Sequence, residues 1–186
     1  MNKKAIQNIP VPYLLISFSL IPVFLIANFL PAQAGTEICL RIDNFLDQHL
    51  LGTVGFWSSN FPFSSRVTTS YISLFGPIFA AIAAYLIHAQ IVMDPEQYRR
   101  LTLKKYLSAL FVILVLLTIF VSINYFEAID LAEHNRKFRL FGLNAFMYSA
   151  FASAMMLCFY AVTLCGYVAF YYIPRLFIER RRSGAV

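Results

Sequence analysis

The sequence predicts an all-α integral membrane protein. We expect a four-transmembrane-helix bundle with both termini cytoplasmic and an amphipathic helix in the first outer loop. Three observations predict this fold class. The 186 residues are 60% hydrophobic and 13% charged, whereas soluble domains carry about 25% charge. Four apolar windows reach the bilayer length of about 20 residues and lack Asp, Glu, Lys and Arg. The basic residues gather in alternate connecting segments. Residues 1–186 are expected to form a single membrane domain.

The four predicted spans cover residues 11–30, 71–92, 106–126 and 146–173. Each is expected to be helical, because a helix satisfies its own backbone hydrogen bonds in lipid. The fourth window is long enough to tilt or to extend into the interface. PAQAG, residues 31–35, offers a competing interpretation, because its Ala-Gln-Ala resembles a signal-peptidase site. The preceding apolar stretch exceeds the usual length of about 7–15 residues, which favours retention. Cleavage of residues 1–34 would leave three spans.

The distribution of basic residues predicts the orientation. Ten of the 15 basic residues lie at the N-terminus, between the second and third spans, or after the fourth span: Lys3, Lys4, Arg99, Arg100, Lys104, Lys105, Arg175, Arg180, Arg181 and Arg182. Residues 31–70 and 127–145 carry the other five bases and six of the nine acids. Because Lys and Arg are enriched in cytoplasmic loops, both termini are expected in the cytoplasm and these two segments outside.

The first outer loop, residues 31–70, contains the amphipathic pattern TEICLRIDNFLDQHLLG. Its stripe recurs at helical spacing and comprises Ile38, Ile42, Phe45, Leu46, His49 and Leu50. Thr36 can cap the start of this helix and Gly52 its end. The pattern predicts an amphipathic helix lying on the outer membrane boundary. A lid that packs on the bundle is the alternative.

An aromatic segment, FWSSNFPF, follows at residues 56–63. Its rings, including that of Trp57, suit the headgroup layer of a membrane. The alternative is an exposed surface that a partner contacts. Trp57 is therefore a candidate partner-binding residue.

The second outer loop, residues 127–145, sorts its charges by sign: Glu127, Asp130 and Glu133 precede Arg136, Lys137 and Arg139. The spacing of three predicts that the acids share a helical face. Glu133 and Lys137 are expected to pair at i,i+4. One interpretation is a solvated helical turn that ends the third span. The other is an outward charged surface for a partner, with Glu127, Asp130, Arg136 and Arg139 as its contacts.

Small residues recur on the second span at Gly76, Ala80 and Ala84, with i,i+4,i+8 spacing. Small residues at this spacing let transmembrane helices approach closely. They can serve the packing of the protein's own bundle, or they can dock another transmembrane helix. The three residues are candidate partner contacts under the second interpretation.

Motifs of common enzymes are absent from the sequence, which has no GxxxxGK, HExxH, paired CxxC or GxSxG. The three histidines are scattered, and the three cysteines form no metal or disulfide pattern. Spans without Asp, Glu, Lys or Arg also argue against ion coupling. We therefore expect no catalytic, cofactor-binding or metal-binding residues and no nucleic-acid partner. The lipid bilayer is the expected surrounding of the chain.

The layout and a local pattern resemble a known family. NYFEAIDL, residues 124–131, is followed by RKFRL, residues 136–140, then by a long aromatic span and the closing RLFIERRR. This is similar to the immunity proteins against pore-forming colicins, of the colicin A type. These are small four-span inner-membrane proteins with both termini inside. A Phe-Glu followed by Arg-x-x-Arg-Leu is comparable in that family, and residues 136–140 match its second part.

The resemblance implies a binding protein and not an enzyme. Such a protein lies in the bacterial plasma membrane, binds the inserted pore-forming domain of its cognate bacteriocin and stops the channel from opening. Charges sorted between two spans can then select the partner, because a wrong charge pairing costs more than a wrong methyl contact.

Two other function classes remain as alternatives. One is a small accessory subunit of a larger bacterial membrane complex, such as a transporter or secretion machine. The other is a membrane enzyme acting on lipid or isoprenoid, which would need an acid or nucleophile near the membrane face. The only acid clusters that could serve it are Asp94 with Glu96 and the segment 127–139. Pro95 and Glu96 fit better as the first turn of a short helix.

Overall fold

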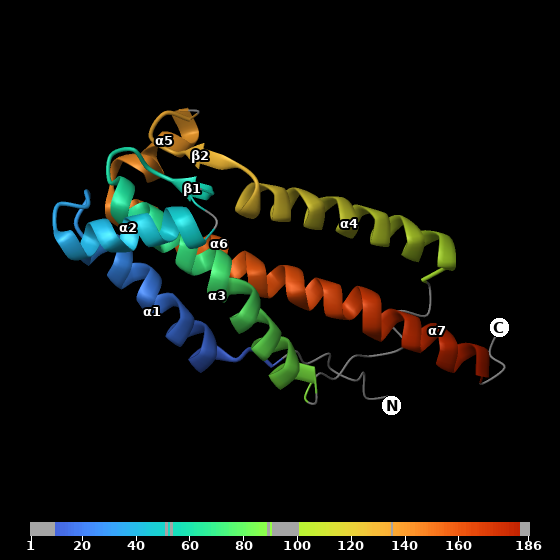
Figure 1. Ribbon diagram of the computed structural model, residues 1–186. Coiled ribbons are helices and arrows are strands. Elements are labelled where there is room, and N and C mark those ends of the chain that lie inside the picture. The colour runs from blue at the N-terminus through green and yellow to red at the C-terminus, as the bar shows by residue number, and fades with distance from the viewer. Residues whose placement is uncertain are drawn as a thin grey trace.

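The computed structural model describes residues 10–50, 52, 54–88, 90, 101–134 and 136–182. Residues 179–182 are described by their backbone alone. Of all the described residues, 79% are helical. Its elements in chain order (Figure 1) are α1 (Tyr13–Phe29), α2 (Glu37–His49), β1 (Gly55–Trp57), α3 (Pro62–His88), α4 (Leu103–Tyr125), β2 (Ala128–Asp130), α5 (Arg136–Leu143), α6 (Ala145–Tyr167), the π-helix η2 (Val168–Tyr172) and α7 (Ile173–Arg182).

Three helices are long and apolar enough to cross a bilayer: α3, α4 and the helix Ala145–Ile178, which contains α6 and most of α7. The fourth apolar helix, α1, has 17 residues. At 1.5 Å per residue it extends about 25 Å, somewhat less than the hydrocarbon core of about 30 Å. The helical content and the three apolar helices are those of a helical membrane protein, as the sequence predicts.

The core lies where α1, α3 and α6 pack together. Its buried apolar side chains include Val23 and Ala27 on α1, Ile72 on α3 and Met156 on α6. Hydroxyl groups connect the same three helices. The Tyr160 hydroxyl donates to Ser19 Oγ at 2.8 Å, the Tyr71 hydroxyl donates to the Ser19 carbonyl at 3.1 Å, and the Thr69 and Tyr148 hydroxyls lie 2.8 Å apart. These hydroxyl groups are thus satisfied within the bundle, as an apolar surrounding requires.

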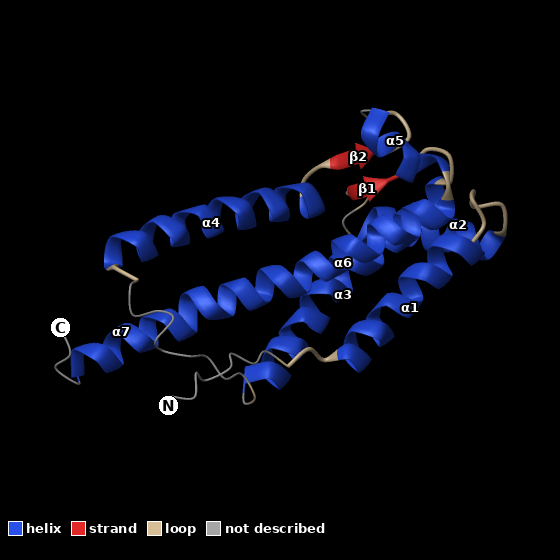
Figure 2. Ribbon diagram, turned by 180° about the vertical axis from the view of Figure 1, so that it is seen from behind, coloured by secondary structure: helices blue, strands red, loops and turns tan. Residues whose placement is uncertain are grey.

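Two short strands join the connecting segments at one end of the bundle. β1 and β2 pair in parallel, with Gly55 opposite Ala128 and Trp57 opposite Asp130. Both strands and α5 lie beyond the end of α4 (Figure 2). We call residues 54–61 and 126–144 together the cap. α1 and α4 begin, and α7 ends, away from the cap (Figure 1).

The predicted second span begins too late. α3 starts at Pro62 and not near residue 71, so nine residues assigned to the first outer loop are helical. Pro62 suits the first helical position because its missing N–H is not needed there. The first turns are rich in Ser and Thr, which hides them from a hydropathy window. Their hydroxyls bond back to the helix, as Thr68 Oγ1 does to the Ser64 carbonyl at 2.7 Å. The predicted span end, residues 89–92, lies mostly outside the described residues.

The predicted helical turn at residues 127–133 is wrong. Residues 128–130 form β2, because their backbone pairs with β1, so Glu127, Asp130 and Glu133 do not share a helical face. α5 begins only at Arg136, which leaves Glu133 outside it. Among the described residues no ion pair joins Glu133 to Lys137. The pairing of β1 with β2 joins segments about 70 residues apart in the sequence. The local spacing of residues does not reveal such a pairing.

The predicted amphipathic helix is present as α2. Thr36 Oγ1 accepts a hydrogen bond from the Cys39 N–H at 3.3 Å, which caps its start. Gly52 follows its end with a φ of 65°, and the Gly52 N–H donates to the Leu46 carbonyl at 3.3 Å. Positive φ is accessible to glycine at little cost. Both predicted end signals are therefore confirmed.

Candidate partner-binding site

Two hydrogen bonds to one carbonyl join α5 to another part of the cap. Ser58 Oγ donates to the Gly142 carbonyl at 2.6 Å, and Asn60 Nδ2 donates to the same oxygen at 3.0 Å. Gly142 is buried and leaves no room for a side chain, because an added Cβ would lie 2.5 Å from the Leu131 carbonyl carbon. These contacts fix α5 against the loop that follows β1.

Two of the acids named from the sequence accept hydrogen bonds, Asp130 within the cap and Glu127 from α4. Asp130 Oδ1 accepts hydrogen bonds from the Ser59 N–H at 3.1 Å and the Ala132 N–H at 2.8 Å. Glu127 is exposed, and its Oε1 accepts from Ser122 Oγ at 3.1 Å. Asp130 therefore shapes the turn after β2. Glu127 keeps most of its carboxylate at the surface.

The bases named from the sequence form an exposed face on α5. Arg136, Lys137 and Arg139 are exposed, and within the described part of the chain no acid forms an ion pair with them. They occupy the first turn of α5, where a positive charge interacts unfavourably with the helix dipole. The other side of α5 is anchored, since the Phe141 ring lies 5.2 Å from that of Phe151 on α6. We call Arg136, Lys137 and Arg139 the basic face.

Trp57 and the small-residue stripe are less accessible. Trp57 is half-buried in β1, and its carbonyl accepts from the Leu131 N–H at 2.9 Å. Gly76 is buried, and an added Cβ would lie 2.7 Å from the Phe159 ring of α6. Ala80 is 1% exposed. Gly76 and Ala80 thus pack inside the bundle, whereas Ala84 is half-buried and lines an apolar groove of about 230 Å³ among α1, α3 and α6.

A further surface, on α4, is not among the residues named from the sequence. Its half-buried residues recur in alternating steps of four and three: Tyr106, Leu110, Ile113, Leu117, Phe120 and the buried Asn124. We call these six residues the α4 seam. This is the spacing of helices that pack side by side. None of the most apolar stretch of α4 is buried, and Phe111 on its other side is 68% exposed. The hydrophobic pattern of the sequence does not reveal the seam, because every side of this helix is apolar.

The cap end of the α4 seam is closed by side chains from α3 and α6. The Tyr125 hydroxyl donates to the Ser73 carbonyl at 2.7 Å. Ser73 Oγ donates to the Asn124 carbonyl at 3.3 Å. The Phe120 ring lies 4.8 Å from the Phe159 ring. These contacts hold the last two turns of α4 against the bundle.

The other end of the α4 seam is attached by a hydrogen bond to a carbonyl near Pro174. In η2 the Ile173 N–H donates to the Val168 carbonyl, five residues back. The next bond of this pattern would join residue 174 to the Ala169 carbonyl, but Pro174 has no N–H. The Tyr106 hydroxyl of α4 donates to that carbonyl at 3.0 Å instead. α4 is thus attached near both of its ends, and its middle turns are the least covered.

This attachment predicts the effect of removing the Tyr106 hydroxyl. Tyr106→Phe is expected to lower the free energy of unfolding by about 1 kcal/mol, since interhelical hydrogen bonds in membranes contribute about that much. Thermal unfolding in one detergent measures the change. Tyr85→Phe is the matched control, because Tyr85 is 81% exposed and should tolerate the same deletion. Equal stability of the two variants would show that the Ala169 carbonyl does not need this donor.

Comparison with protein-family models, with curated proteins and with solved structures found no match. The described residues contain no group of three or more His, Cys, Asp or Glu that could hold a metal ion. The features that stand out are a half-covered transmembrane seam and an exposed basic face. Both are suited to binding another protein.

Proposed function

We propose that the chain is an immunity protein of the bacterial inner membrane. It binds the inserted pore-forming domain of a cognate bacteriocin and blocks the opening of its channel. The observation that carries this proposal is the α4 seam, in which a membrane-length helix is attached near both ends and has no buried residue in its most apolar stretch. The resemblance of residues 124–140 to the colicin A type of immunity protein adds to it.

A seam of this kind suits a guest transmembrane helix. Lipid tails are as apolar as leucine, so helices in a bilayer associate through close packing and polar contacts rather than through hydrophobicity. A guest helix lying beside α4 would cover the flanks of Leu110, Ile113 and Leu117, which the bundle covers only in part. A pore-forming domain supplies apolar helices once it has entered the membrane. Binding there would hold those helices in a closed arrangement.

The basic face discriminates between the cognate toxin and other toxins. Apolar helices of different toxins resemble one another, and packing alone separates them poorly. Charged groups discriminate better, because like charges brought together cost several kcal/mol. Arg136 and Arg139 are exposed beside the end of the bundle, where they can contact acids that flank the inserted helices. Glu127 adds an exposed negative charge at the same end.

The proposed orientation places the cap in the periplasm and both termini in the cytoplasm. The excess of basic residues before α1, from the end of α3 to the first turn of α4, and after η2 in the sequence supports it. Retention of the first helix belongs to the same proposal. α1 buries Val23 and Ala27 in the core, so loss of residues 1–34 would uncover α3 and α6.

The alternative function is that of an accessory subunit in a larger membrane complex, whose permanent partner would cover the α4 seam. The two functions differ in what the chain does alone. A subunit is expected to be degraded without its partner and to protect against no toxin. An immunity protein is stable alone and active in trans.

Survival of a sensitive bacterium tests the proposal. Cells expressing the chain are made to export each of a panel of pore-forming bacteriocins into the periplasm, which bypasses the surface receptors. The expected result is survival with one toxin and death with the others, at a normal level of the chain in the membrane. A chain that is absent from the membrane, or death with every toxin including any encoded beside its gene, would favour the subunit.

A further inference from the structure

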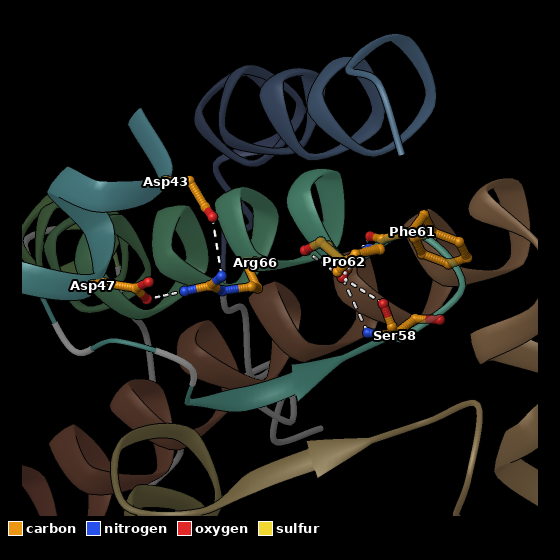
Figure 3. Close-up of polar contacts among 7 residues, drawn as sticks. Asp43, Asp47, Ser58, Phe61, Pro62 and Arg66 are labelled. Carbon is orange, nitrogen blue, oxygen red and sulfur yellow. Dashed lines mark hydrogen bonds and ion pairs between the residues drawn. The ribbon is translucent and has the colours of Figure 1, made fainter. Parts of the chain in front are cut away.

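One arginine of the bundle forms ion pairs with two acids of α2. Arg66 on α3 forms an ion pair with Asp43 at 3.1 Å and a second ion pair with Asp47. Figure 3 shows both carboxylates directed from α2 toward Arg66. The arginine side chain is only 15% exposed. Because the acids are four residues apart on α2, pairing both of them with one guanidinium restricts rotation of α2 about its own axis.

This rotation turns part of the apolar stripe of α2 away from the bundle. At about 100° per residue, Ile38, Ile42 and Phe45 lie on one side of the helix, and Asp43 and Asp47 lie nearly opposite. These three stripe residues stay exposed, with Ile38 at 72%, Ile42 at 39% and Phe45 at 53%. Leu46, a stripe residue between the two sides, is buried.

The third side of α2 is polar. Four exposed residues fall on it at helical spacing: Glu37, Arg41, Asn44 and Gln48. Arg41 and Glu37 form an i,i+4 ion pair at 2.6 Å. α2 therefore has three sides: acids toward Arg66, an exposed apolar stripe, and an exposed polar side.

α3 is longer than the hydrocarbon core of a bilayer is thick. Its 27 residues extend about 40 Å, which exceeds the hydrocarbon core by about 10 Å. Arg66 lies in the second turn, so the Arg66 ion pairs fall near the headgroup layer. The end of α2 meets α3 at a hollow of about 370 Å³, which is lined by His49, Leu50 and Leu74 among others. Leu74 is 46% exposed. The C-terminal end of the apolar stripe thus adjoins an exposed apolar residue of α3.

We propose that the Ile38–Ile42–Phe45 side of α2 inserts into the lipid leaflet on the cap side, held at that rotation by Arg66. The occupant of this surface is phospholipid, because the stripe adjoins the exposed side of a membrane-length helix and the polar side of α2 is presented to water. Helices with one apolar and one charged side bury the apolar side at the boundary of headgroups and acyl chains. α2 would then be an interfacial helix rather than a lid.

Spin labels on α2 test this assignment in the full chain. The three native cysteines are replaced by serine, and single cysteines are introduced as Ile38→Cys, Phe45→Cys, Asn44→Cys and Gln48→Cys. The labelled proteins are placed in bilayers of phosphatidylethanolamine and phosphatidylglycerol. Labels at 38 and 45 should collide more with oxygen, which partitions into lipid, than with a water-soluble nickel chelate. The matched labels at 44 and 48 should show the reverse preference.

Two results would overturn the proposal. Labels at 38 and 45 that prefer the nickel chelate would place the stripe in water. Labels there that are immobile and reached by neither reagent would show that protein covers the stripe. The role of Arg66 has its own variant, Arg66→Gln, in which the contrast between the two sides should shrink. An unchanged contrast in that variant would show that another contact sets the rotation.

Discussion

Under the proposed function, reversing both charges in Arg136→Glu with Arg139→Glu is expected to remove most of the protection against the cognate toxin. Both side chains are exposed on α5, so they are free to meet acids of a bound toxin. Each reversal is expected to weaken binding about tenfold, or about 1.4 kcal/mol, because a wrong charge pairing replaces a favourable one. The dose of toxin that kills half the cells should fall about 100-fold.

The control for this variant keeps the charge. Arg136→Lys with Arg139→Lys is expected to retain most of the protection, and immunoblots of membranes should show equal levels of all three proteins. The fold should tolerate the reversal, since acids in the first turn of a helix are favoured by its dipole. Undiminished protection by the Glu variant, at an equal level, would remove the basic face from the recognition site.

Gly142→Ala is expected to disrupt the cap. The added methyl group would lie 2.5 Å from the Leu131 carbonyl carbon and 2.8 Å from Ala132 Cα. These are backbone atoms, so no rotation of a side chain relieves the clash. Moving α5 outward would break the hydrogen bonds from Ser58 and Asn60 to the Gly142 carbonyl. Overpacking of this severity costs about 3 kcal/mol, which thermal unfolding in detergent measures.

Gly35→Ala is the matched control for this variant. An added Cβ at Gly35 meets no atom within 4 Å, so the same change of residue should leave the unfolding temperature nearly unaltered. The Gly142 variant should also protect cells less, because it displaces the basic face. Equal unfolding temperatures for the two variants would show that α5 does not pack on residues 131–132 as described.

Much of the fold could be predicted from sequence because lipid imposes simple rules. The bounds of α4 and the start of α6 follow from apolar windows, and the ends of α2 follow from Thr36 and Gly52. The start of α3 could not be predicted this way. Its Ser and Thr residues look like a loop, yet they are buried against α6 or bonded to their own helix. β1 and β2 were also missed, because three-residue strands from distant segments carry no local pattern.

The candidate site was predictable in its charges but not in its geometry. Arg136 and Arg139 are exposed, as an outward charged surface requires, whereas Asp130 has its carboxylate engaged with backbone N–H groups. The spacing of the acids suggested a helix, but pairing of residues 128–130 with β1 overrides it. The α4 seam emerges only from burial. Its attachment to Ala169 is a hydrogen bond between helices, joining residues 63 positions apart in the sequence, which no local pattern predicts.

The membrane potential of cells under attack tests the central claim most directly. Cells with and without the chain export the toxin identified by survival into the periplasm, and a voltage-sensitive dye follows the potential. We predict that the chain abolishes depolarisation by that toxin alone, while other pore-forming toxins depolarise both strains equally. Equal depolarisation of both strains by every toxin, including one encoded beside the chain's own gene, would contradict the account.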